Sequence, residues 1–279
     1  MPELPEVETY ARQLRPYLIG RTVTDLEVLW ERSVANPGSD DLRRRLSGQI
    51  IVGVTRRGKY LTFLLATGAR LLIHLKMSGR IHVEPTDAPR RPHDRVVFVL
   101  DNGMEMRFND ARKFGRVYLV EANDAVTGPL GPEPLDAGFG LDDFAALIHR
   151  RSGAIKPLLL NQTFLAGLGN IYTDEALYRA RIHPLRKASR LGDDEIQALY
   201  HAIRDILRLS IESQGTSFDY VYPSALREHA PNYQSYLQVY GRAGAACPRC
   251  GQLIQRTVIG GRGTHFCPDC QRRNDSQGG

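Results

Sequence analysis

The chain has 279 residues, of which 42% are hydrophobic, and it carries a formal net charge of +6. This length allows two domains with a sizeable buried core. The sequence contains no apolar run of membrane-spanning length, and its start lacks the basic and then apolar layout of a secretion signal. We therefore expect a cytoplasmic protein without membrane contact. The basic excess is compatible with a polyanionic partner.

The first six residues, MPELPE, carry a candidate nucleophile. Once Met1 is removed, the nitrogen of Pro2 is a free secondary amine next to Glu3. A neutral α-amino group can form a Schiff base, and a nearby carboxylic acid can supply the proton that the attack needs. The same residues also suit an ordinary helix start, because proline lacks the unpaired N–H and glutamate favours the positive end of the helix dipole.

A helical pattern and then strand-like patterns make up the first half of the chain. Apolar residues at helical spacing predict a helix over 5–18. Short runs rich in β-branched residues follow, separated by turn signals, and they predict a β-sandwich or barrel-like domain. The strand-like runs are 22–30, 50–58, 60–66, 69–75, 95–100, 105–109 and 116–122.

The second half begins after a stretch rich in glycine and proline that is typical of a linker. The hydrophobic period then changes to that of helices. The predicted helices cover 141–151, 158–166, 172–181 and 193–213. We expect an α+β multidomain chain with a β-sandwich domain over 1–128, a linker over 129–136, a helical domain over 137–240 and a small C-terminal piece over 241–279 that holds all four cysteines.

All four cysteines lie near the C-terminus in two CxxC pairs, which argues for a metal site rather than disulfides. Four thiolates on two tight turns match the tetrahedral coordination of Zn²⁺, and a site closed by four cysteines is structural. The predicted ligands are Cys247, Cys250, Cys267 and Cys270. Arg262 lies between glycines in the enclosed loop, where it either contacts a phosphate or is simply solvated.

Two polar segments bounded by glycine, 74–80 and 109–116, each contain a large apolar residue. Met77 and Phe114, together with Arg112, are the kind of exposed wedge that separates stacked bases. Burial of both apolar residues in the core is the alternative.

The segment 165–178 predicts a helix break at its glycines and a new helix start near Asn170. The backbone N–H groups and the side-chain amide at such a start bind phosphate readily. An ordinary helical hairpin explains the pattern as well. Lys59 lies between two strand-like runs, where a lysine usually points to solvent.

Six segments occur in the order PELPEVE, RRGKYL, HLKMSG, NDARKFG, GLGNIYTDEALY and GRGTHFCPDC. Together they resemble the formamidopyrimidine-DNA glycosylase family, the bifunctional base-excision repair enzymes for oxidised purines. The resemblance spans nearly the whole chain. It implies an N-terminal β-sandwich with an N-terminal helix, a helix–two-turns–helix motif in the helical domain and a C-terminal β-hairpin zinc finger. It also implies a monomer that acts on damaged double-stranded DNA.

The resemblance assigns catalytic roles at the N-terminal end. Pro2 matches the nucleophile that attacks the deoxyribose C1′ and displaces the damaged base, and Glu3 matches the acid that assists opening of the sugar ring. Lys59 matches an active-site lysine that contacts the lesion or its phosphate, and Glu6 matches an acidic position in the lesion pocket. The Schiff base leads to β- and then δ-elimination, which cut the strand at the abasic site.

The resemblance also implies DNA contacts and one structural zinc ion held by the four cysteines. Three side chains fill the gap that the flipped nucleotide leaves, two grip phosphates around the lesion, and a lysine lies near the DNA. These residues are Met77, Arg112 and Phe114 for the gap, Asn170 and Arg262 for the phosphates, and Lys156.

The sequence departs from the family in one stretch, 215–242, which is rich in tyrosine and leaves the lesion preference open. Catalysis also requires the removal of Met1, because the nitrogen of Pro2 is otherwise an amide. An endonuclease VIII-like glycosylase for oxidised pyrimidines and a zinc-bearing DNA-binding protein without catalysis are the alternatives. We expect a bacterial-type cytoplasmic protein that associates with the nucleoid when it acts on DNA.

Overall fold

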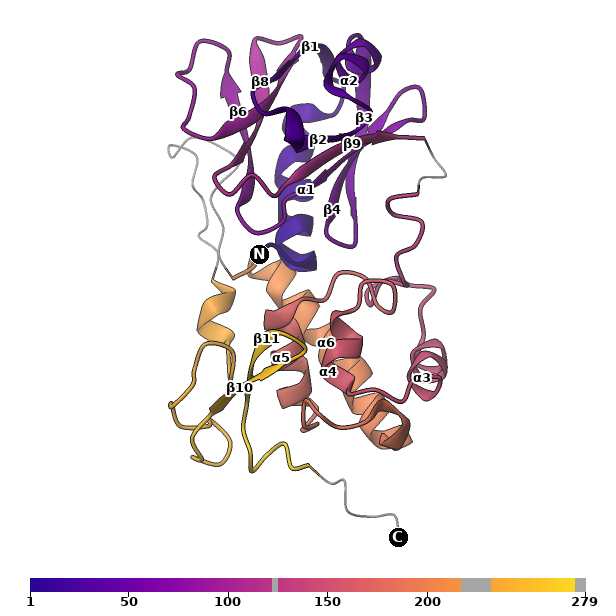
Figure 1. Ribbon diagram of the computed structural model, residues 1–279, viewed down its shortest axis with the longest axis vertical. Coiled ribbons are helices and arrows are strands. Elements are labelled where there is room, and N and C mark those ends of the chain that lie inside the picture. Colours follow the sequence, from indigo (N-terminus) through magenta and orange to yellow (C-terminus); the bar gives the residue numbers. More distant parts are fainter. Residues whose placement is uncertain (122–124, 217–231, 274–279) are drawn as a thin grey trace. The chain divides into compact units, whose positions relative to one another are not determined.

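The computed structural model describes residues 1–121, 125–216 and 232–273 (Figure 1). The chain forms two compact units. One consists of Met1–Pro129 and Gln214–Pro231, and the other of Leu130–Ser213 and Asn232–Gly279. None of the helices in the described ranges combines the length and the apolar composition that crossing a bilayer requires.

The first unit is built on a nine-stranded sheet in the order β2-β9-β5-β4-β3-β1-β7-β8-β6. Neighbouring strands are antiparallel except for the parallel pair of β2 and β9. The strands are β1 (Thr22–Val28), β2 (Val34–Asn36), β3 (Gln49–Arg57), β4 (Tyr60–Leu65), β5 (Arg70–His74), β6 (Gly79–Pro85), β7 (Asp94–Leu100), β8 (Met104–Asp110) and β9 (Arg116–Val120). The helices are α1 (Leu4–Leu18), α2 (Ser39–Leu46) and the short 3-10 helix η1 (Glu31–Ser33).

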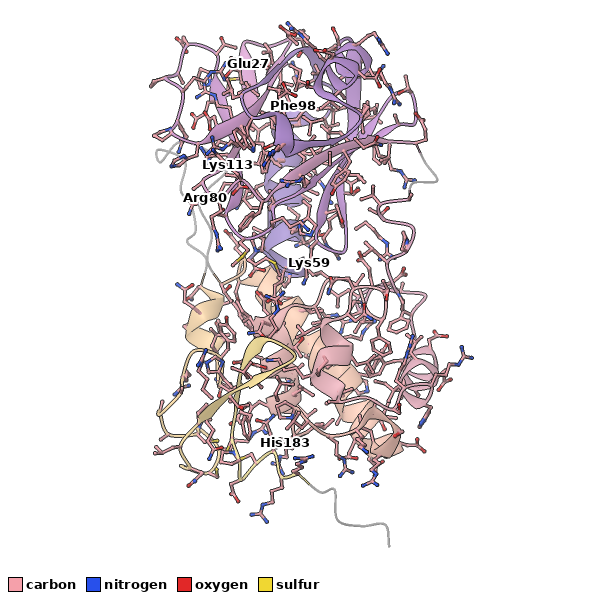
Figure 2. The ribbon with its side chains drawn as sticks, viewed as in Figure 1. Glu27, Lys59, Arg80, Phe98, Lys113 and His183 are labelled. Atoms are coloured by element: carbon pink, nitrogen blue, oxygen red, sulfur yellow. The ribbon has the colours of Figure 1, made fainter. Side chains whose placement is uncertain are left out.

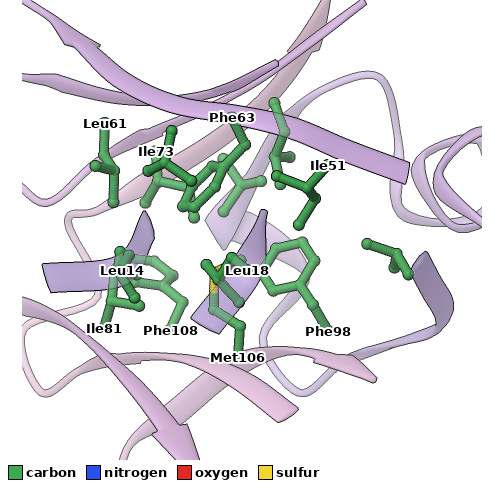
Figure 3. Packing of buried hydrophobic residues seen from close by; sticks show 14 of the residues in the cluster. Leu14, Leu18, Ile51, Leu61, Phe63, Ile73, Ile81, Phe98, Met106 and Phe108 are labelled. Carbon is green, nitrogen blue, oxygen red and sulfur yellow. The ribbon is translucent and has the colours of Figure 1, made fainter. Parts of the chain in front are cut away.

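Helix α1 lies inside the fold of this sheet. Its apolar residues recur at helical spacing, and Leu14 and Leu18 are completely buried. Figure 3 shows these two leucines between the side chains of two groups of strands, which supply Leu61, Phe63 and Ile73 on one side and Ile81, Phe98, Met106 and Phe108 on the other. The sheet therefore folds over into two layers around α1, which confirms the predicted β-sandwich with an N-terminal helix.

Four elements of the first unit have no counterpart in the predicted order: the three-residue elements η1 and β2, and the longer α2 and β6. Helix α2 contains only two buried apolar residues, Leu42 and Leu46, in eight positions, so its apolar stripe is too short to stand out. Strand β6 carries buried polar residues, His82 and Glu84, where a sandwich strand ordinarily carries apolar ones. The alternation that predicts strands is therefore obscured in β6.

The second unit contains the predicted helices and the C-terminal hairpin. Its elements are α3 (Leu141–His149), α4 (Ile155–Leu160), α5 (Asn170–Arg179), η2 (Ala188–Arg190), α6 (Asp193–Glu212), η4 (Tyr233–Tyr236), β10 (Gln255–Ile259) and β11 (Arg262–Phe266). Helix α5 packs against α4, α6 and β11. The apolar face predicted for 193–213 is buried along α6.

The helix predicted over 158–166 is wrong beyond its first three residues, because α4 ends at Leu160. Asn161 bonds through its side chain to the backbone and hydroxyl of Thr163, at 3.0 and 2.9 Å, and this local bonding competes with helix continuation. Gln162 then donates to the carbonyls of Leu160 and Leu168. This stretch forms a compact turn that leads to α5, and its apolar side chains are buried although the backbone is not helical.

Candidate functional site

The start of α1 gathers the N-terminal acidic residues. Glu3 precedes the helix as its N-cap, and its backbone N–H donates to Glu6 Oε2 at 2.9 Å. The other oxygen of Glu6 accepts bonds from the backbone and hydroxyl of Thr216 at 3.0 and 3.2 Å. Both carboxylates are 2% exposed, whereas Pro2 is partly exposed. Pro2 thus leads into a helix start with two buried carboxylates, a setting that suits an amine nucleophile.

Lys59 lies in the tight turn between β3 and β4, where Arg57 pairs with Tyr60. Strand β3 packs against α1, and the Arg56 guanidinium is 3.1 Å from the carboxylate of Glu8. This ion pair places the turn near the N-terminal part of α1, in agreement with the position of Lys59 in Figure 2. Lys59 is only 6% exposed. The structure therefore brings the predicted lysine to the same end of the first unit as Pro2.

His74 lies beside this turn as a neutral side chain. Its ring meets Tyr60 edge to face, with 4.6 Å between the centroids. Burial, followed by the charges of Lys76 and Lys59, lowers the pKa of His74 to about 3. The neutral Nδ1 accepts a bond from the backbone N–H of Lys76 at 3.0 Å, and Lys76 has a left-handed φ of +53°. His74 therefore holds the backbone directly before Met77.

The two segments that carry Met77 and Phe114 leave the sheet side by side. In the antiparallel pair of β6 and β8, Gly79 lies opposite Asp110, so the loop before β6 and the loop after β8 extend from the same end of the sheet. Met77 is 46% exposed and Phe114 is 49% exposed. Arg112 lies over the ring of Phe114 at 5.0 Å. The structure thus places this apolar pair at the surface rather than in the core.

Asn170 and Arg262 come together in the second unit. Helix α5 begins at Asn170, directly after Gly169, as the glycine break predicts. The Nδ2 of Asn170 donates to the carbonyl of Gly263 at 2.8 Å, and Gly263 follows Arg262 in β11. Arg262 is exposed. An exposed guanidinium close to the N-terminus of a helix is suited to binding phosphate.

Lys156 is completely buried, which differs from the expected DNA contact. Its ammonium is 2.6 Å from Asp174 Oδ1 and 3.2 Å from the carbonyl of Gly263. The other oxygen of Asp174 accepts from the backbone N–H of His265 at 2.8 Å. Because the ammonium neutralises a buried carboxylate and has no surface to offer a phosphate, we revise the interpretation. Lys156 positions β11, the strand that begins with Arg262.

The four cysteines converge at the base of the hairpin. Their sulfur atoms all lie within 4.8 Å of one another, and the Cys247–Cys270 and Cys250–Cys267 distances are 3.9 and 3.5 Å. A tetrahedral Zn²⁺ with Zn–S bonds of about 2.3 Å separates its sulfurs by about 3.8 Å. The thiols form no disulfide. The residues present therefore fit one structural zinc ion.

The surroundings of this cluster favour the thiolate at Cys247 and oppose it at Cys250 and Cys270, whose pKa values are raised. Burial opposes ionisation of Cys247, but bonds from Tyr178 and from the backbone N–H groups of Arg249 and Cys250 prevail and lower its pKa to about 6. The Tyr178 hydroxyl lies 3.3 Å from the sulfur of Cys247. Burial and the neighbouring thiols raise the pKa of Cys270, so a cation is needed for all four thiolates to form together.

Most of the stretch 215–242 lies outside the described residues, which resume at 232. Its final part is anchored by Glu175, whose carboxylate accepts from three successive backbone N–H groups at 2.8–3.0 Å. The donors are Gln238, Val239 and Tyr240. Burial raises the pKa of Glu175 in spite of these bonds. The same helix therefore holds both the hairpin and the chain that leads into it.

Three buried carboxylates that organise these segments were not predicted as site residues: Asp110, Asp174 and Glu175. All three lie within motifs that the sequence had already singled out, NDARKFG and GLGNIYTDEALY. Asp174 and Glu175 on α5 could have been found from the sequence, because an acidic residue at a core position of the helical period is unusual. Asp110 ends a strand, where an exposed carboxylate is equally ordinary.

Comparison with known protein families gives three successive matches. Residues 1–117 match the formamidopyrimidine-DNA glycosylase N-terminal domain, residues 130–221 match the formamidopyrimidine-DNA glycosylase H2TH domain, and residues 244–273 match a zinc finger found in FPG and IleRS. The zinc-finger match and the four-sulfur cluster agree on one zinc site. These matches also confirm the predicted helix–two-turns–helix motif and zinc-finger hairpin.

Individual relatives match along the whole chain. The formamidopyrimidine-DNA glycosylase of Pelotomaculum thermopropionicum is 46% identical over 278 residues, which cover 98% of this chain and 99% of the relative. A complex of Lactococcus lactis FPG (MutM) with Fapy-dG containing DNA has a TM-score of 0.88 at 38% identity, covering 97% of this chain and 100% of that chain. A structure of MutM with carbocyclic 8-oxo-G containing DNA gives a TM-score of 0.89 at 39% identity, with the same coverage.

Proposed function

The chain belongs to the formamidopyrimidine-DNA glycosylase family, and from this premise we propose that it removes oxidised purines from duplex DNA and then cuts the strand at the resulting abasic site. The observation that carries the proposal is the relationship along the full chain, at 46% identity over 278 residues. Solved relatives with TM-scores of 0.88 and 0.89 hold Fapy-dG containing DNA and carbocyclic 8-oxo-G containing DNA. The substrate class is therefore 8-oxoguanine and formamidopyrimidines.

Recognition starts with phosphates, since DNA binding draws most of its affinity from cationic contacts. Arg262 and the start of α5 at Asn170 supply such contacts in the second unit. The glycosidic bond of a stacked nucleotide cannot be reached, so the damaged nucleotide leaves the helix. The exposed side chains of Met77, Arg112 and Phe114 then fill the gap, and Arg112 provides the hydrogen-bond donors for the orphaned cytosine.

The chemical step belongs to the N-terminus. The lone pair of the Pro2 nitrogen attacks C1′, the bond from C1′ to the base breaks, and the base leaves with the bonding electrons and takes up the proton that the Pro2 nitrogen loses. Glu3, as an acid, protonates the ring oxygen while the sugar opens, which yields an iminium at C1′. Lys59, at the same end of the first unit, contacts the lesion or its phosphate. Glu6 shapes the pocket through its bonds to Glu3 and Thr216.

Strand cleavage follows from the iminium, which acidifies the protons on C2′. Loss of one of these protons expels the 3′ phosphate by β-elimination, and a second elimination expels the 5′ phosphate. Hydrolysis then frees Pro2. An enzyme that activated only water would remove the base and leave the strand intact, so the amine accounts for both activities.

The zinc ion serves the fold of the C-terminal hairpin. Zn²⁺ bound by four thiolates has no open position for substrate. It fixes the base of β10 and β11, and therefore the position of Arg262 at the start of β11.

The test is reduction with borohydride during reaction with a duplex that contains 8-oxoguanine opposite cytosine. We expect a covalent protein–DNA species, with the DNA linked to Pro2 of a chain that lacks Met1. Peptide mapping identifies the linked residue. Pro2→Gly should still bind the duplex but remove the base more slowly, and an unchanged rate would show that another amine attacks.

Two results would redirect the proposal. A strong preference for thymine glycol over 8-oxoguanine would make the chain an endonuclease VIII-like enzyme for oxidised pyrimidines. If a chain with a free Pro2 gave no trapped species, the remaining interpretation would be a zinc-bearing DNA-binding protein without catalysis. Because the proposed substrate is chromosomal DNA, the proposal places a monomeric enzyme in the cytoplasm, at the nucleoid during repair.

A further inference from the structure

The loops that carry Met77 and Phe114 share one buried carboxylate. Asp110 is the last residue of β8 and is 0% exposed. Its Oδ1 accepts from the hydroxyl of Ser78, the neighbour of Met77, and from the backbone N–H of Arg112 at 3.2 Å. Its Oδ2 accepts from the backbone N–H of Gly115, which follows Phe114, at 2.7 Å. One side chain therefore holds both ends of the 112–115 loop and the adjacent loop.

Ser78 closes the link between the two loops. Its oxygen also accepts from the backbone N–H of Arg112 at 3.2 Å, so the hydroxyl donates to Asp110 and accepts from the loop after β8. The backbone of Asp110 is fixed as well, because its N–H donates to His93 and its carbonyl accepts from Arg95 Nε at 2.8 Å. Asp110 therefore cannot shift to follow a loop that moves.

Neighbouring glycines keep the cluster tight. A Cβ on Gly115 would lie 2.3 Å from the ring of Phe108 and 3.2 Å from Asp110 Oδ2. A Cβ on Gly79 would lie 2.4 Å from the carbonyl of Leu75. Neither position has room for a side chain, so the backbone of each loop packs closely around this cluster.

We propose that Asp110 is a positioning residue that locks Met77, Arg112 and Phe114 into one preformed wedge before DNA is bound. The inference rests on the proposed function, since the wedge acts only where a nucleotide must leave a duplex. Its side chain is buried and bonded to backbone N–H groups and to Ser78, so Asp110 acts through the loops. A preformed wedge avoids the cost of ordering two loops during base flipping.

The test compares two substrates with Asp110→Asn. In the variant, one carboxylate oxygen is replaced by an NH₂ group, which cannot accept hydrogen bonds. This NH₂ group must face at least one N–H or O–H that donated to the carboxylate, so we expect the loops to separate. We expect single-turnover excision of 8-oxoguanine from a duplex to fall about 10- to 100-fold, as for misplaced groups. Borohydride trapping on an abasic site in a single strand needs no flipping and should stay within about twofold of wild type.

Controls separate positioning from general damage. Glu84→Gln changes a different buried carboxylate, on β6, whose partner within the described residues is Arg91 and not either loop, and it should leave the duplex rate unchanged. If Asp110→Asn does not fold, Ser78→Ala carries the same test, with Ser78→Thr restoring the hydroxyl and the rate. In a chain with Met77, Arg112 and Phe114 all changed to alanine, adding Asp110→Asn should have no further effect on the duplex rate.

The possible results are distinct. An unchanged duplex rate in Asp110→Asn, an equal loss on both substrates, or a further loss in the triple-alanine background overturns this inference while the proposed function stands. A wild-type chain that neither excises nor traps overturns both. A selective loss on duplex that disappears in the triple-alanine background supports the wedge.

Discussion

Asp110 in the first unit and Asp174 in the second have the same task but different partners. Each is 0% exposed and accepts a backbone N–H in the segment that carries residues proposed to contact DNA. Asp174 also forms a 2.6 Å ion pair with Lys156, whereas the side chain of Asp110 accepts, within the described residues, from hydroxyl and backbone donors. A buried carboxylate thus serves as a clamp with or without a counter-charge, and the two cases should respond differently to substitution.

The largest effect should come from removing the counter-charge. Lys156→Met leaves the Asp174 carboxylate buried without its cation, which should lower the free energy of unfolding by about 3–5 kcal/mol. Urea unfolding of the full chain, followed by circular dichroism, measures the change. The matched double variant with Asp174→Asn removes the buried charge and should recover most of the loss. If Lys156→Met lowered the free energy of unfolding by less than about 1 kcal/mol, the counter-charge would not distinguish the Asp174 clamp from the Asp110 clamp.

Substitution of Asp110, the clamp without an ion pair, should lower the free energy of unfolding by a smaller amount. Asp110→Asn leaves a buried N–H donor without an acceptor, and we expect the free energy of unfolding to fall by about 1–3 kcal/mol. The same urea titration measures it. A loss as large as that of Lys156→Met would show that the carboxylate charge stabilises the first unit more than its hydrogen bonds imply.

His74 is a further buried polar group of the first unit, and its effect on the pH dependence of stability shows whether it is neutral in the folded chain. Its folded pKa of about 3 lies below the unfolded value of about 6.5, so between these values the unfolded chain binds a proton that the folded chain does not. Stability should therefore decrease as pH falls through this window, by up to about 1.4 kcal/mol per pH unit. In His74→Asn, whose amide oxygen can replace Nδ1 as acceptor, this contribution should disappear. Equal slopes for both proteins would contradict the assignment.

The smallest effect concerns Arg262, whose strand the Asp174 clamp holds. Arg262→Ala should weaken binding to lesion-containing duplex and reduce the slope of log affinity against log salt by about 1. Fluorescence anisotropy at several salt concentrations measures this slope. Arg272→Ala is the control, because that side chain is exposed and paired with Asp269, and it should leave the slope unchanged. An unaltered slope in Arg262→Ala would exclude a phosphate contact.

Local patterns in the sequence predicted much of this protein. The CxxC spacing predicted the zinc site, because two residues between thiols suit one tight turn around a metal. The apolar period predicted α1 and α6, since burial of one helix face requires it. The order of the motifs identified the family, whose matches span 1–117, 130–221 and 244–273.

Other features depend on residues far apart in the chain, and no local pattern contains them. The register that sets Gly79 opposite Asp110 brings the Met77 and Phe114 loops together, and it is a property of two paired strands. The family resemblance predicts Lys156 near the DNA, yet the packing of α4, α5 and β11 buries it against Asp174. Spacing thus predicted the zinc ligands and the family resemblance predicted the other site residues, while strand pairing and burial determined which of them face outward and which hold the others in place.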